Sequence, residues 1–173
     1  MAARPVTGAP FRWDLARRQR LGSLLDGPPA WDYPAFFDEL RECCARVAAA
    51  AADGDMVFLG RSPESLFDYL SGALADTAWR DRLVLLNLSM LHDTAEAVAR
   101  SNPAGLRAVH AQLEAAGLSP AEIAAGERPR VFVDLVYAGR TFGRFLGLLE
   151  HWALADGVDV AAVHRRIRFL GIT

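Results

Sequence analysis

The sequence predicts a three-layer α/β domain with a mainly parallel central sheet. Three short apolar runs, residues 55–60, 82–88 and 131–136, have the length and composition of buried strands, and stretches with helical spacing of apolar side chains separate them. Strands and helices that alternate in this way form a parallel sheet through right-handed crossovers. The chain has 173 residues, 52% of them hydrophobic, which suits one domain of this class.

The first 30 residues are expected to form an N-terminal arm, and residues 31–173 a single α/β domain. Proline, glycine and arginine interrupt any sustained period in the arm. Its larger apolar side chains need cover, and the core, the functional site or a second subunit could each supply it: Trp13, Leu15, Leu21, Leu24 and Leu25. Residues 33–52 then form a helix that Asp53 and Gly54 end, and this helical segment covers one face of the sheet.

Helices are expected to follow the first two strands. After the first strand, Ser62 is a suitable N-cap with Pro63 as the first helical residue. Residues 94–126 read as a helical insertion, broken at Asn102 and Gly117 and capped again at Ser119. The insertion is longer than one crossover needs and could be a lid, a partner surface or extra cover for the sheet. The spacing of its apolar residues Leu106, Val109 and Leu113 favours extra cover.

The last third of the chain repeats the pattern of strand and helix. A helix is expected over residues 141–154, ended by Asp156 and Gly157. The final segment, residues 158–173, fits one more strand, reached through Arg165 and Arg166.

The most informative motif is the apolar strand that ends on Asp134 and turns through glycine into a helix. Gly139 allows close approach of a ligand, and Thr141 is a candidate N-cap that offers its hydroxyl to an anion. Backbone N–H groups at such a helix N-terminus bind phosphate. Asp134 is placed to accept hydrogen bonds from ribose hydroxyls or to hold a metal. The turn also contains Tyr137, Ala138 and Arg140, and Arg140 is a candidate ligand contact.

A second candidate anion site follows the first strand. Gly60, Arg61 and Ser62 lie in that loop, and arginine can form a bidentate pair with a phosphate. The alternative interpretation gives Ser62 only the role of an N-cap. Ligands bind at the carboxyl edge of a parallel sheet, where this loop and the turn of residues 137–141 are expected to meet.

The strand and turn of residues 131–141 resemble the signature of the type I phosphoribosyltransferases. That signature has four apolar residues, two acids, an apolar residue, any residue, Thr or Ser, Gly, any residue and Thr. Asp134, Val136, Gly139 and Thr141 fall in register, whereas Leu135 replaces the second acid and Ala138 replaces the hydroxyl residue.

The resemblance implies a phosphoribosyltransferase-like core over about residues 55–173. It implies that the protein binds phosphoribosyl pyrophosphate or a nucleotide 5′-phosphate and transfers the phosphoribosyl group with Mg²⁺. The loop of residues 60–62 would hold the pyrophosphate, residues 137–141 the 5′-phosphate, and Asp134 the ribose and the metal. The replacement of the second acid by Leu135 points to an alternative, a non-catalytic module that binds nucleotides or sugar phosphates. A phosphosugar isomerase-like domain is another alternative, because residues 59–62 and 138–141 also resemble the loops of that family.

Composition restricts the class of partner. A net charge of −2 argues against a nucleic-acid-binding protein, so the expected partner is a small molecule, with a second copy of the chain as a further candidate. No apolar run is long enough to span a membrane, no signal peptide is recognisable, and we expect a cytoplasmic protein. Cys43 and Cys44 are adjacent and are expected to be reduced. Asn87, Ser89 and His92 follow the second strand near the expected ligand edge.

Overall fold

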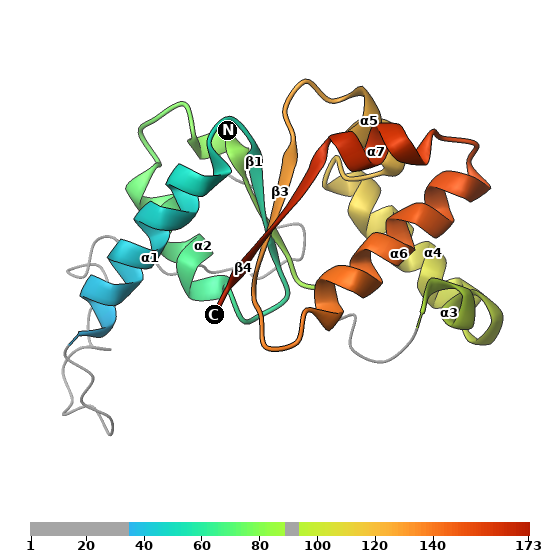
Figure 1. The fold of residues 1–173 in the computed structure, drawn as a ribbon, viewed down its shortest axis with the longest axis horizontal. Helices are drawn as coiled ribbons and strands as arrows, with labels where there is room; N and C mark the ends of the chain where they lie inside the picture. Colours follow the sequence, from blue (N-terminus) through green and yellow to red (C-terminus); the bar gives the residue numbers. More distant parts are fainter. Residues whose placement is uncertain (1–34, 89–93) are drawn as a thin grey trace.

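The chain forms a four-stranded, fully parallel sheet between two layers of helices (Figure 1). The computed structural model describes residues 35–88 and 94–173, so the predicted N-terminal arm, Ser89 and His92 lie outside the described residues. The strand order is β2-β1-β3-β4. The strands are β1 (Asp55–Leu59), β2 (Leu83–Leu86), β3 (Arg130–Leu135) and β4 (Ile167–Ile172). The expected three-layer α/β architecture with a parallel sheet is therefore confirmed.

The helices divide between the two faces of the sheet (Figure 1). One face carries α1 (Phe36–Ala51) and α2 (Glu64–Ala73). The other carries α3 (Ala95–Ser101), α4 (Pro103–Ala115), α5 (Pro120–Ala125), α6 (Arg140–Ala155) and α7 (Val160–Arg165). The chain moves outward from β1 to β2 and then returns past β1 to β3. Crossovers of one hand put helices on opposite faces when the direction reverses in this way.

Alternate side chains of the strands enter the two cores. Met56 and Phe58 of β1 pack with α1 and α2, whereas Val57 and Leu59 pack on the opposite side with α4 to α6. All four are at most 2% exposed. Central parallel strands are buried on both faces, which explains why the predicted strands are apolar almost throughout.

The helical insertion covers the sheet, as the spacing of its apolar residues predicted. Leu106 and Leu113 are buried in the same core as Phe145 and Leu149 of α6. The predicted breaks are also confirmed, because the Asn102 side chain accepts a hydrogen bond from the Gly105 N–H at the start of α4. Ser119 and Glu122 form a capping box at the start of α5.

Two predicted N-caps are wrong. The residue at the N-cap of α2 is Pro63 and not Ser62, and neither α2 nor α6 has a side-chain cap. Helix α6 begins at Arg140 because Gly139, at φ 68°, turns the chain one step earlier than predicted, so Thr141 already lies inside the first turn.

A short helix and a 3₁₀ turn were not predicted. Helix α7, which Asp159 caps, precedes β4 in the final segment, where only a strand was expected. A 3₁₀ turn, η3 (Arg80–Arg82), leads into β2. Both cysteines are free thiols, as expected. Among the described residues, no helix is both long enough and apolar enough to cross a membrane.

Candidate functional site

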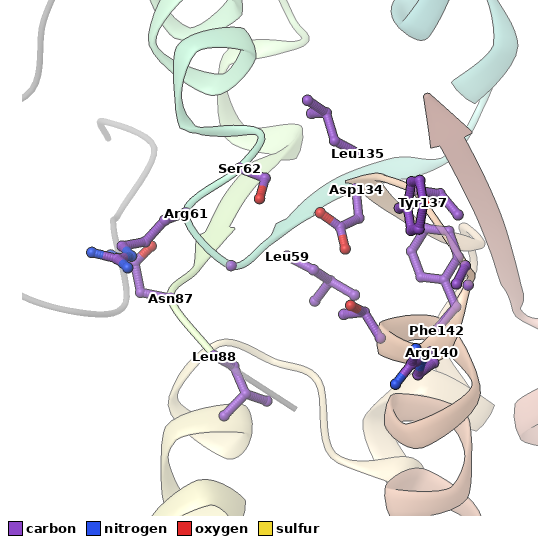
Figure 2. Close-up of a pocket in the computed structure, with 15 residues that line it drawn as sticks. Leu59, Arg61, Ser62, Asn87, Leu88, Asp134, Leu135, Tyr137, Arg140 and Phe142 are labelled. Carbon is purple, nitrogen blue, oxygen red and sulfur yellow. The ribbon is translucent and has the colours of Figure 1, made fainter. Parts of the chain in front are cut away.

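A cavity of about 630 Å³ opens at the carboxyl edge of the sheet, where β1 and β3 end (Figure 2). All the site residues predicted from the sequence line it: Gly60, Arg61, Ser62, Asp134, Tyr137, Ala138, Gly139, Arg140 and Thr141. Its volume lies within the range of roughly 300–1,000 Å³ that is usual for small-molecule sites. The two loops that the sequence placed at one edge therefore do share one cavity.

The position of the cavity follows from the strand order. β1 and β3 are neighbours, with Asp55 opposite Arg130 and Phe58 opposite Val133. The connection from β1 runs towards β2, and the connection from β3 runs towards β4, in the opposite direction. The loops after β1 and β3 therefore diverge and leave a crevice between them, which is the usual position of ligands in open α/β sheets.

The two turns that line the cavity have the same local chemistry. Gly60 has φ 76° and Gly139 has φ 68°, and each is followed by an arginine and a hydroxyl residue. The turns differ in the helices that they open. Helix α6 has no acidic residue in its first turn, whereas α2 carries Glu64 there. The positive end of the helix dipole is thus less compensated at α6, which favours an anion at the turn of residues 137–141.

Asp134 is the buried acid of the cavity. It is 6% exposed, and its carboxylate points into the cavity from β3 (Figure 2). Burial raises the pKa of this carboxyl, while hydrogen bonds from the Leu135 backbone and from the Thr141 side chain partly oppose the rise. Thr141 therefore contacts Asp134 as well as lining the cavity. A buried acceptor held in this way suits the hydroxyl groups of a sugar.

The residue after Asp134 makes the cavity a one-acid site. Leu135 is 45% exposed and points away from Asp134, because successive side chains of a strand lie on opposite faces (Figure 2). Tyr137, in the following turn, is fully exposed at the rim. Asp134 is the one carboxylate among the described residues that line the cavity.

The fit of a metal ion depends on this single acid. The described residues contain no group of three or more His, Cys, Asp or Glu side chains that could hold a metal. Mg²⁺, however, is commonly held by one or two carboxylates together with the phosphates of a substrate. Asp134 could serve as the one protein ligand in that mode. The described residues would not form a metal site built entirely from protein groups.

The structure adds cavity residues that were not predicted as site residues. Leu59, Leu88 and Phe142 provide apolar walls, and Asn87 lies where β2 ends. Asn87 Oδ1 is buried and has no hydrogen-bond partner within residues 35–88 and 94–173. A polar residue at the end of an apolar strand was the available signal for Asn87. The apolar residues gave no signal, because their spacing is that of ordinary core residues.

The cavity thus combines two arginines, one buried acid, two glycine turns and several apolar side chains. Arg61 and Arg140 form no ion pair with any described residue, so both guanidinium groups are available to an anion. Comparison of the chain with protein-family models, with curated proteins and with solved structures found no match.

Proposed function

We propose that the cavity binds a phosphorylated sugar or a nucleotide 5′-phosphate. The observation that carries this proposal is the pair of turns, Gly60–Arg61–Ser62 and Gly139–Arg140–Thr141, which follow neighbouring strands and line one cavity around Asp134. The turn at α6 supplies backbone N–H groups and Arg140 to a phosphate. Asp134 lies between the two turns, where it would accept hydrogen bonds from sugar hydroxyls.

Calorimetric titration with ribose 5-phosphate, phosphoribosyl pyrophosphate, a hexose phosphate and inorganic phosphate tests this proposal. We expect saturable binding of at least one of the sugar phosphates. Arg140→Ala should weaken it about tenfold or more, because a charge-assisted contact to phosphate is lost. Arg144→Ala is the matched control, since Arg144 lies on the same helix one turn later and does not line the cavity. A folded protein that binds neither these compounds nor a nucleoside 5′-phosphate would disprove the proposal.

Mg²⁺-dependent phosphoribosyl transfer is the second candidate function. The buried position of Asp134, with Thr141 as its hydrogen-bond partner, supports it. In this reaction an acceptor displaces pyrophosphate from the anomeric carbon of phosphoribosyl pyrophosphate, and the C–O bond to the leaving group breaks as the bond to the acceptor forms. Asp134 would orient the ribose hydroxyls, and Mg²⁺ would offset the charge of the leaving group.

Release of pyrophosphate in the presence of nucleobases tests for transfer. We expect turnover to need Mg²⁺ and to be lost in Asp134→Asn, which keeps the size of the side chain but not its charge. Binding without turnover would instead support the non-catalytic module, whose main support is Leu135 at the position of a second acid. A preference for hexose phosphates would favour the isomerase-like alternative.

A further inference from the structure

We infer that the β2 side of the cavity is a subsite for a nucleobase and that Asn87 determines its specificity. The ligand class would then be nucleoside 5′-phosphates and not free sugar phosphates. This inference rests on the proposed function, because it takes the turn at α6 as the site of the phosphate. It assigns a ligand group, the nucleobase, to the remaining part of the same cavity.

The first argument is the extent of the cavity. Arg140 and Phe142 lie on one side of Asp134, and Arg61 and Asn87 lie on the other (Figure 2). Asn87 follows β2, which is two strands away from β3. Neighbouring strands are about 4.8 Å apart, so the two sides of the cavity are separated by roughly 10 Å. A phosphate at α6 and a ribose at Asp134 would leave the β2 side unfilled.

The second argument is the chemistry of that side. Leu59 and Leu88 line it with apolar atoms, of which a small part is accessible, since the two residues are 2% and 9% exposed. Sugar hydroxyls and phosphates gain nothing from such a wall, whereas the flat face of a base does. Arg61 adds a planar guanidinium group, which stacks well on aromatic rings.

The third argument is the unpartnered oxygen of the Asn87 amide. Its Oδ1 is buried and has no hydrogen-bond partner in the part of the chain that the structure describes. Five other buried side-chain atoms of the described residues also lack a hydrogen-bond partner, among them Asp55 Oδ1 and Arg82 Nε. Asn87 is distinguished by its place on the lining of the cavity, where a ligand can supply the missing donor. Rotation about the terminal torsion, which is broad for asparagine, would turn the amide towards the cavity. An amide both donates and accepts, so it can pair with the edge of a base such as adenine.

Titration of AMP, GMP, CMP, UMP and ribose 5-phosphate against the full chain tests the inference. We expect at least one of the nucleotides to bind about tenfold or more tightly than ribose 5-phosphate. Asn87→Leu, which keeps the branched shape of the side chain and removes both polar atoms, should weaken binding of that nucleotide about tenfold and change the affinity for ribose 5-phosphate less than twofold. Asn87→Asp removes the donor and keeps the size, and it should change the order of preference among the four nucleotides.

The outcomes separate this inference from the proposed function. Equal affinity for nucleotides and ribose 5-phosphate, with both lost in Arg140→Ala, would overturn the base subsite and leave the phosphate site intact. Equal weakening of both ligands by Asn87→Leu would also overturn it. Absence of binding of all five compounds to folded protein would overturn the base subsite, and the proposed function falls with it only if phosphoribosyl pyrophosphate and the hexose phosphate do not bind either. Melting curves of both Asn87 variants confirm folding, and Asn87→Asp provides the test if Asn87→Leu does not fold.

Discussion

The two ends of the sheet use similar polar residues for opposite purposes. At the amino end, where the strands begin, charged side chains pair with one another: Asp55 with Arg82 and Arg130, and Asp53 with Arg168. At the carboxyl end, three polar side chains line a cavity: Arg61, Asn87 and Arg140. The two guanidinium groups form no ion pair with a described residue, and Asn87 Oδ1 forms no hydrogen bond with one. We therefore expect the paired charges to contribute to stability and the charges without a described partner to be available to a ligand.

The amino end is built around Asp55 at the start of β1. Its carboxylate accepts a hydrogen bond from Arg130 at the start of β3 and lies 3.5 Å from Nε of Arg82, just before β2. Arg82 also donates to the backbone carbonyls of Ala52 and Gly54, and its guanidinium lies 3.7 Å from the centre of the Trp79 ring. One acid therefore holds three strands in register.

Removal of the central acid should have the largest effect. Asp55→Ala leaves Arg82 and Arg130 partly buried without their carboxylate, since the three side chains are between 14% and 19% exposed. We expect the free energy of unfolding to fall by about 2–4 kcal/mol. Urea denaturation measures the loss. A loss below about 0.5 kcal/mol would show that this end is not held by its charges.

The glycine turn at the cavity should come next in size. Gly139→Ala forces a side chain into positive φ, which costs about 1–2 kcal/mol, although a Cβ there would meet no atom within 4 Å. Gly143→Ala is the matched control, because Gly143 lies inside α6 and also has open space. Alanine there should stabilise the protein by about 0.5–1 kcal/mol. Thermal unfolding of both variants should show shifts of opposite sign.

Neutralisation of the cavity acid should have a smaller effect, and in the stabilising direction. Burial raises the pKa of Asp134, so this group contributes stability that is complete below about pH 4 and is lost as the pH rises through its folded pKa. Asp134→Asn should therefore raise the melting temperature at pH 7 and lose this advantage near pH 4. Asp81→Asn, an exposed acid outside the cavity, is the control. A lower melting temperature of Asp134→Asn at pH 7 would show that the buried carboxylate stabilises the fold, contrary to this prediction.

The exposed ion pair of the amino end should have the smallest effect. Arg168 and Asp53 are 3.3 Å apart, with side chains that are 51% and 72% exposed. Such pairs contribute about 0.2–1 kcal/mol and are screened by salt. Arg168→Ala should change the free energy of unfolding by less than about 0.5 kcal/mol, and less still in 0.5 M salt. A larger effect would mean that β4 is held by charge as strongly as β1 and β3.

The strands could be predicted because strands buried on both faces are short runs of apolar residues, which are visible in the local sequence. The run of residues 131–136 is apolar up to Asp134, and the observed strand covers Arg130–Leu135. The cavity could be predicted in outline for a related reason, since a glycine followed by an arginine and a hydroxyl residue occurs after two of the strands. Both patterns lie within a few consecutive residues, so no knowledge of distant contacts was needed.

The helix starts and the state of the Asn87 side chain could not be predicted in the same way. Ser62 and Thr141 are good N-cap residues, yet the glycines before them set the path of the chain and so the first helical residue. In the sequence, Asn87 stands out as a polar residue at the end of an apolar strand, near the expected ligand edge. That its oxygen is buried without a described partner is a property of the folded chain, which local sequence does not contain.

The sequence by itself determined the alternation of helices and apolar strands and the residue types of the two turns. These follow from burial and backbone chemistry over short stretches of chain. Tertiary structure alone decided that β1 and β3 are neighbours, which turns two separate loops into one cavity with Asp134 between them. Strand order depends on contacts between residues about 75 positions apart, such as Asp55 and Arg130, and no stretch of local sequence records such contacts.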